Sequence, residues 1–143
     1  MKKILTKSTQ ETKKLAKDLA SKLKGGEILA LSGDLGAGKT TFVQGFAKGL
    51  GIREKITSPT FVVAKRFPVS SPDFQYFYHI DMYRIPGDED VKELGLKEVF
   101  NNNTNLVIIE WSHRVSKLLP KGTVWVKMSH GDREEERVIS VGE

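Results

Sequence analysis

The sequence predicts an α/β fold in which helices cover both faces of a mixed, partly antiparallel central sheet, so that the domain has three layers. A glycine-rich loop stands between a short apolar run and a segment with helical spacing, all within residues 28–50. A second apolar run covers residues 106–109, and residues 124–141 alternate apolar and polar positions around a turn. A length of 143 residues suits one hydrophobic core, so we expect a single domain over residues 1–143.

The first predicted element is an amphipathic helix that follows a basic start. Leucines recur at every fourth position from Leu15 to Leu23, which marks one buried stripe. Ser8 and Glu11 have the spacing of a capping box at the helix start, and Gly25-Gly26 predicts its end.

The net charge of +5 belongs to this segment. Residues 1–24 hold eight lysines against Glu11 and Asp18, a net +6, whereas residues 25–143 are close to neutral. We interpret the lysines as a solvated helix face; a surface for RNA or an acidic partner is the alternative.

The rest of the chain predicts strands and helices in alternation. Apolar runs bounded by turn residues predict strands, and apolar residues three or four apart predict helices. The expected elements are a strand at Ile28–Leu31, a helix at Phe42–Leu50, an antiparallel strand pair at Thr60–Phe67 and Phe74–Tyr83, a helix at Asp88–Phe100, a strand at Leu106–Ile109, and a hairpin over Val124–Val141 that turns at His130-Gly131-Asp132.

Several classes of protein are disfavoured. The chain has no cysteine, which rules out disulfides and thiolate metal sites. No signal-peptide core follows the basic start, and no run of about 18 apolar residues occurs. We therefore expect a soluble, cytoplasmic protein with no membrane or DNA partner.

The strongest motif is Gly33-x4-Gly38-Lys39-Thr40, which has the P-loop spacing. Its glycines allow the backbone to approach a triphosphate and to point successive N–H groups at it, assisted by the start of the next helix. Lys39 is expected between the β- and γ-phosphates, the Thr40 hydroxyl on Mg²⁺, and Thr41 near the α-phosphate. The expected fold is thus P-loop NTPase-like, and the predicted phosphate-binding residues are Gly33, Gly36, Ala37, Gly38, Lys39, Thr40 and Thr41.

Two acids are candidates for the metal and the attacking water. Glu110 directly follows the buried run at residues 106–109, where P-loop proteins usually carry an Asp. It could bind Mg²⁺ directly, bind it through water, or orient the attacking water. Asp81, at the end of an aromatic strand, is the second candidate, and Thr60 in Ser58-Pro59-Thr60 fits either a γ-phosphate contact or a plain turn.

Taken together, the separated motifs resemble the TsaE (YjeE-type) ATPase family over nearly the whole chain. The resemblance implies an ATPase that works with TsaD-like and TsaB-like proteins to form threonylcarbamoyladenosine in tRNA. ATP hydrolysis would reset or activate these partners, and tRNA would be met indirectly through them. The motifs are Gly33 to Phe42, Ser58-Pro59-Thr60-Phe61, His79-Ile80-Asp81-Met82-Tyr83-Arg84, Glu110-Trp111 and Leu119-Pro120.

Carried over by position, the resemblance implies catalytic roles for Lys39, Asp81 and Glu110. It implies Mg²⁺ on Thr40 and Glu110, with Asp81 supporting the metal or the water. Three further positions would contact ATP: Thr60 at the γ-phosphate, and Gln10 and Arg133 near the adenine.

This chain departs from the family after Glu110-Trp111, where Ser112-His113-Arg114 replaces a segment that often carries another acid. A second carboxylate is therefore not expected directly after Glu110.

Three other functions share the glycine loop. A small P-loop kinase would transfer the γ-phosphate to a metabolite or nucleotide, but the arginines after the loop are scattered and leave no clustered lid. A GTPase would need an Asn-Lys-x-Asp sequence, which is missing. A nucleotide-gated binding module with negligible turnover overlaps with the ATPase interpretation.

Overall fold

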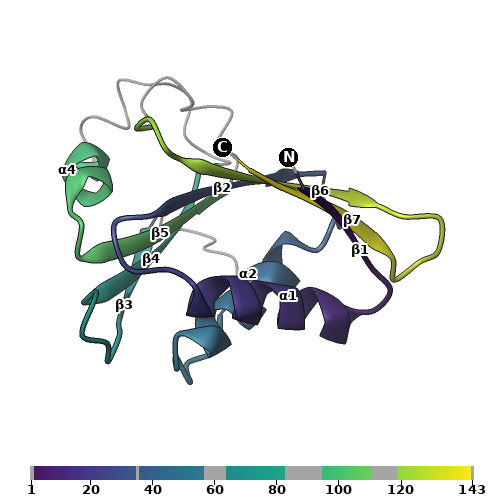
Figure 1. Cartoon of the computed structure of the whole chain (residues 1–143), viewed down its shortest axis with the longest axis horizontal. Helices are drawn as coiled ribbons and strands as arrows, with labels where there is room; N and C mark the ends of the chain where they lie inside the picture. The colour runs from purple at the N-terminus through teal and green to yellow at the C-terminus, as the bar shows by residue number, and fades with distance from the viewer. Residues whose placement is uncertain (1, 35, 57–63, 83–94, 111–118, 143) are drawn as a thin grey trace.

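The structure is a computed structural model that describes residues 2–34, 36–56, 64–82, 95–110 and 119–142. Within these ranges, the strands are β1 (Lys2–Thr6), β2 (Ile28–Gly33), β3 (Ala64–Pro68), β4 (Tyr76–Asp81), β5 (Asn105–Glu110), β6 (Val124–His130) and β7 (Arg137–Gly142). The helices are α1 (Thr9–Ser21), α2 (Lys39–Gly49) and α4 (Leu96–Asn101) (Figure 1).

The strands form one mixed sheet with the order β1-β7-β6-β2-β5-β4-β3. The central strand β2 is parallel to both of its neighbours, β5 and β6, and β4 is parallel to β5. The outer pairs β1–β7, β6–β7 and β3–β4 are antiparallel. The predicted combination of a parallel centre with antiparallel flanks is confirmed. The predicted C-terminal hairpin is confirmed, and so is the antiparallel pairing of the two earlier runs over β3 and β4, while residues 60–63 and Tyr83 of those runs lie outside the described residues.

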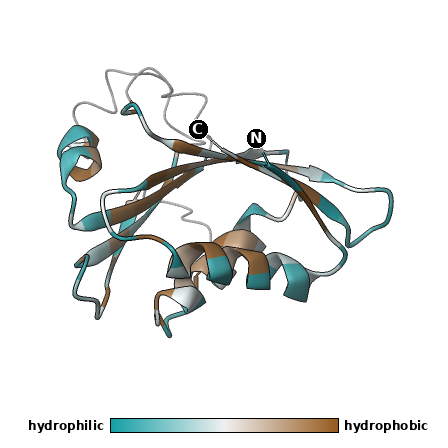
Figure 2. Ribbon diagram, viewed as in Figure 1, coloured by the Kyte–Doolittle hydropathy of each residue, from teal (hydrophilic) through white to brown (hydrophobic). Residues whose placement is uncertain are grey.

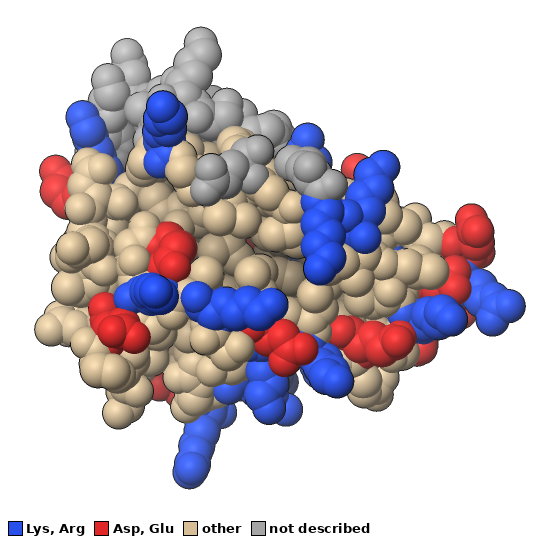
Figure 3. Space-filling view, viewed as in Figure 1, with Lys and Arg blue, Asp and Glu red and all other residues tan. Residues whose placement is uncertain are grey.

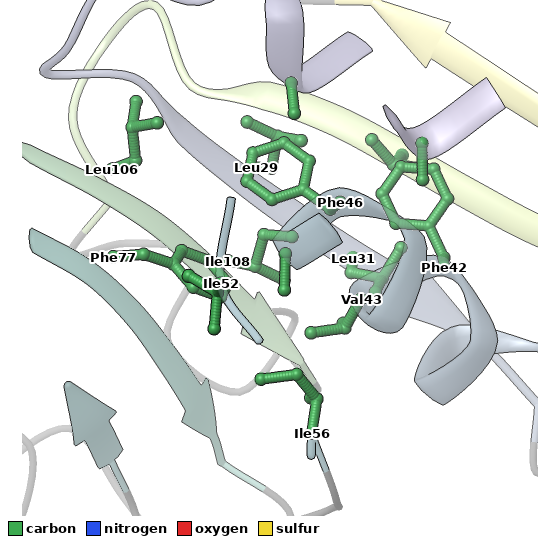
Figure 4. Close-up of a cluster of buried hydrophobic side chains, with 14 of the residues drawn as sticks. Leu29, Leu31, Phe42, Val43, Phe46, Ile52, Ile56, Phe77, Leu106 and Ile108 are labelled. Carbon is green, nitrogen blue, oxygen red and sulfur yellow. The ribbon is translucent and has the colours of Figure 1, made fainter. Parts of the chain in front are cut away.

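Two hydrophobic cores lie on opposite faces of the sheet. On one face α1 and α2 cover β2 and β5, where Phe46 and Phe77 pack with ring centroids 5.5 Å apart (Figures 1 and 4). On the other face Leu96 and Phe100 of α4 pack with Ile109 and its neighbours. Figure 2 shows the hydrophobic colour concentrated along the central strands. Helices on both faces of a sheet give the predicted three-layer α/β fold.

The first predicted helix is confirmed as α1, with Ser8 as its N-cap, but it ends at Ser21, before Leu23 and the predicted stop at Gly25-Gly26. The Ser8 hydroxyl accepts a hydrogen bond from the Glu11 N–H, while the Glu11 carboxylate accepts one from the Lys7 N–H. On the face shown in Figure 3, lysines and arginines are interspersed with acidic side chains. The interpretation of the lysines of residues 1–24 as a solvated helix face stays a prediction.

Two local predictions need correction. No element was predicted for residues 2–6, yet they form β1, which pairs with the distant strand β7. The helix predicted from Asp88 to Phe100 cannot be continuous, because Gly95 has φ of +71° and α4 begins after it. The acidic first turn predicted at Asp88 lies outside the described residues.

Candidate nucleotide-binding and hydrolysis site

The site lies at the C-terminal ends of the central parallel strands of the sheet. Asp81 is level with Glu110 in the β4–β5 register, and β2 ends beside them at Gly33, which is level with Met128 of β6. Ligand sites of open α/β sheets are expected at this carboxyl edge. The predicted loop and both predicted acids therefore meet at one edge.

The phosphate loop has the conformation that the glycine spacing predicts. Gly36 and Gly38 adopt φ of +80° and +97°, values that side-chain-bearing residues rarely take. The Ala37 N–H donates to the Asp34 carbonyl at 3.0 Å and closes the turn. Helix α2 then begins at Lys39, directly after Gly38, so the positive end of its dipole lies at the loop.

Close packing against β6 gives a second reason for glycine in this loop. A Cβ on Gly33 would lie 2.5 Å from the Met128 carbonyl oxygen, which is a backbone atom that cannot swing away. A Cβ on Gly38 would lie 3.3 Å from the Met128 methyl group. The loop is thus held directly against β6.

Lys39 is buried, with only 7% of its surface exposed, and its ammonium donates to the Gly33 carbonyl at 2.8 Å. Burial lowers its pKa below the ordinary value. The negative charges of Glu110, Asp81 and Asp34 oppose this shift, in that order of size. The predicted ammonium and the predicted carboxylates are therefore close enough to interact electrostatically.

Glu110 has a partner that the sequence interpretation missed. His79 Nε2 lies 2.5 Å from Glu110 Oε2, and both side chains are almost fully buried. From the sequence alone, a histidine in this strand is by default an ordinary histidine near a sheet edge. The alternation of β4 contained the signal, because His79 and Asp81 are two residues apart and so face the same side of the sheet.

Arg137 is a second residue that the sequence did not reveal. Its guanidinium donates to the Gly36 carbonyl at 3.1 Å and to the carbonyls of Glu134 and Glu136 at 2.7 and 2.8 Å. Among the described residues, its Nε is a buried side-chain nitrogen with no hydrogen-bond partner, 3.5 Å from where a Cβ on Gly38 would lie. Arg137 therefore links the β6–β7 hairpin to the phosphate loop.

The sequence of this chain is similar to that of a known protein family over most of its length. The model of a family described as "Threonylcarbamoyl adenosine biosynthesis protein TsaE" matches residues 6–139. The chain belongs to the TsaE family. A tRNA threonylcarbamoyladenosine biosynthesis protein TsaE of Bacillus subtilis is 39% identical over 132 residues, or 92% of this chain and 80% of the relative. The TsaE of Treponema pallidum is 37% identical over 133 residues, or 91% of this chain and 95% of the relative.

A solved TsaE-family structure has the same fold. The crystal structure of Bacillus subtilis YdiB superposes with a TM-score of 0.77 at 36% identity, covering 98% of this chain and 83% of that one. The fold of this TsaE-family protein is thus of the P-loop NTPase type, as the glycine loop predicts.

The oxygen donors at the site fit Mg²⁺. Thr40 is half-buried in the first turn of α2, and the carboxylates of Asp81 and Glu110 share one level of the sheet. Mg²⁺ prefers such oxygen ligands and usually completes its shell with phosphates and water. Within the described ranges no three His, Cys, Asp or Glu side chains form a cluster for a metal.

The positions expected near the adenine lie on elements that end at the same edge. Gln10 is exposed in the first turn of α1, and Arg133 is exposed in the turn between β6 and β7. Thr6, at the end of β1, pairs with Arg137 at the start of β7, so both elements reach the phosphate-loop edge. An adenine contact at Gln10 or Arg133 stays a prediction.

Other predicted positions lie outside the described residues. These are Thr60 with its turn Ser58-Pro59, the pair Tyr83-Arg84, and the segment Trp111 to Arg114. None of the helices in the described part of the chain has the length and apolar character that a membrane crossing requires.

Proposed function

We propose that this protein binds ATP with Mg²⁺ in the phosphate loop and hydrolyses it, as a component of the machinery that forms threonylcarbamoyladenosine in tRNA. Hydrolysis would reset or activate partner proteins of the TsaD and TsaB type, and tRNA would be engaged through those partners. The observation that carries the proposal is the convergence of buried Lys39 with Asp81 and Glu110 beside the glycine loop.

The chain's own groups divide the work of binding and hydrolysis. The N–H groups at the start of α2 and the Lys39 ammonium would hold the phosphates. Thr40 with Glu110 would hold Mg²⁺, which neutralises charge on the phosphate oxygens when bound. Asp81 or Glu110 would orient the attacking water. The carbonyl of Gly33 gives the ammonium a partner before ATP arrives.

Removing the Lys39 ammonium is the test of the phosphate site. Lys39→Ala is expected to weaken ATP binding by about 100-fold, because two charge-assisted hydrogen bonds to phosphate are each worth roughly 1.5 kcal/mol or more. Calorimetry on the folded variant measures the change. Unchanged affinity would overturn the assignment of the loop.

Hydrolysis and partnership need a second measurement. Glu110→Ala is expected to retain ATP binding but to lose most of the ATP turnover. The turnover that remains should depend less on Mg²⁺ than wild-type turnover does. Phosphate release should be followed alone and with co-purified TsaD-like and TsaB-like proteins, which we expect to form a stable complex and to stimulate turnover. Transfer of the γ-phosphate to a small acceptor, without release of inorganic phosphate, would instead identify a kinase.

A further inference from the structure

His79 is a buried polar residue in direct contact with a proposed catalytic carboxylate. Its exposed fraction is 1%, and its Nε2 lies 2.5 Å from Glu110 Oε2. An ionised carboxylate has only acceptor atoms, so the histidine must supply the hydrogen of this bond through Nε2–H. The bond therefore constrains both the tautomer of His79 and the orientation of Glu110.

The strand register explains why this bond runs along the sheet rather than straight across it. Asp81 is level with Glu110, while His79 is level with Ile108. Glu110 thus has a like charge beside it in register and the imidazole on the interior side. A hydrogen bond to Oε2 draws one oxygen toward the interior and leaves Oε1 as the atom for a metal or water.

Holding β4 to β5 does not require this pair. Six residue pairs already fix the register of these strands, and Phe77, two residues before His79 and on the same face of β4, packs in the hydrophobic core. A buried polar pair generally adds no more stability than apolar side chains of the same size. A purely structural role therefore leaves the identity of His79 unexplained, whereas a role in orienting Glu110 explains it.

We propose that His79 is a positioning residue for Glu110. It fixes the carboxylate through Oε2 so that Oε1 is presented toward the Mg²⁺ and the attacking water. The proposal rests on the proposed ATP hydrolysis, in which Glu110 serves the metal or the water. His79 itself touches neither ATP nor water in this scheme.

Three substitutions separate positioning from packing. In His79→Gln the amide nitrogen can occupy the place of Nε2, whereas in His79→Asn the shorter side chain ends near the place of Nδ1 and cannot reach Glu110. His79→Leu removes the donor but keeps an apolar bulk. We expect ATP affinity within about threefold of wild type in all three, with kcat reduced at least about tenfold in the Leu and Asn variants and largely restored in the Gln variant.

A binding measurement gives a readout independent of turnover. Mn²⁺ replaces Mg²⁺ in the ATP complex, and its affinity is measured by electron paramagnetic resonance. We expect weaker Mn²⁺ binding in the Asn and Leu variants and near-normal binding in the Gln variant. In the double variant His79→Leu with Glu110→Gln, kcat should be no lower than in Glu110→Gln alone, because residues acting through one another are not additive.

The outcomes distinguish this proposal from the proposed function. Equal kcat and equal Mn²⁺ affinity in the Gln and Asn variants would overturn the positioning role, and thermal unfolding identifies any variant that has lost its fold. If His79→Leu does not fold, the comparison of Gln with Asn still decides. Wild-type protein that binds ATP without hydrolysing it would overturn the hydrolytic function, and Mn²⁺ affinity would still test His79. Wild-type protein that binds no ATP would overturn both.

Discussion

At the scale of single residues, Lys39 has to be both buried and charged. Burial lowers its pKa, while the neighbouring carboxylates of Glu110 and Asp81 partly restore it. A bound triphosphate would add negative charge beside the ammonium and raise the pKa further. The proton affinity of Lys39 is therefore expected to differ between the free and the ATP-bound protein.

This difference predicts a dependence of ATP affinity on alkaline pH. Because the free pKa is the lower one, ATP binding takes up a proton, and affinity is complete below the free pKa and falls as the pH rises through it. The fall should begin below the ordinary lysine value of 10.5. Calorimetry in two buffers of different ionisation enthalpy measures the proton uptake. Lys39→Arg is the control, because its guanidinium stays charged throughout this range.

An affinity that stays constant up to that ordinary value would contradict the prediction. The lowered pKa of Lys39 should also affect the stability of the protein without ATP. Because the unfolded lysine holds its proton more tightly than the folded one, the free energy of unfolding should rise as the pH rises from the lowered pKa toward 10.5.

At the scale of elements, the β6–β7 hairpin and the phosphate loop form one unit. Arg137 bonds to the Gly36 carbonyl of the loop and to two carbonyls of its own hairpin. The three acceptors are backbone oxygens, so the guanidinium fixes the relative position of the two segments. The conformation of the loop consequently depends on a residue that lies 101 positions later in the chain than Gly36.

Arg137→Met is expected to weaken ATP binding by about tenfold. The variant keeps the aliphatic stem but loses a charge-assisted hydrogen bond to the loop, worth roughly 1.5 kcal/mol. Calorimetry with ATP and Mg²⁺ measures the effect. Lys127→Met removes the same charge from an exposed position on β6, and its affinity should stay within about twofold of wild type. Equal losses in both variants would indicate a general effect of charge.

The contact between α1 and α2 depends on Gly45. A Cβ at this position would lie 2.4 Å from the Lys13 carbonyl oxygen of α1. Gly45→Ala should therefore lower the free energy of unfolding by about 2 kcal/mol, because overpacking outweighs the roughly 1 kcal/mol by which alanine favours a helix. Urea denaturation measures the change. Lys48→Ala, at an exposed position in the same helix, should change it by less than about 0.5 kcal/mol. A stabilised Gly45→Ala variant would show that the helices can separate freely.

At the scale of the whole molecule, local patterns predicted most of the fold but not its long-range contacts. The apolar runs at Ile28 and Leu106 predicted β2 and β5 because a buried strand has a composition of its own. β1 was not predicted, because its pairing with β7 is a contact between distant parts of the chain that local patterns do not contain. The contacts of His79 and Arg137 likewise depend on strand register and hairpin placement, which single-sequence periodicity does not contain.

Because the site joins elements from the whole chain, ATP is expected to stabilise the entire fold. At a free ATP concentration of 100 times Kd, linkage adds about 2.7 kcal/mol, which should raise Tm by roughly 5–10 °C in a protein of this size. Thermal unfolding with increasing MgATP measures the shift. Lys39→Ala should show almost no shift, and an equal shift in that variant would place the stabilising nucleotide elsewhere.

The hydrogen bond between the Arg137 guanidinium and the Gly36 carbonyl, which clamps the phosphate loop to the β6–β7 hairpin, can form only late in synthesis. At roughly 5–20 residues per second, the ribosome adds the residues between them in about 5 to 20 seconds. Thr6 of β1 is synthesised even earlier, and its partner in β7 is Arg137, which lies 131 positions later in the chain. For that interval a nascent chain carries the glycine loop without its clamp and β1 without its partner. ATP binding of full strength is consequently a property of the finished chain.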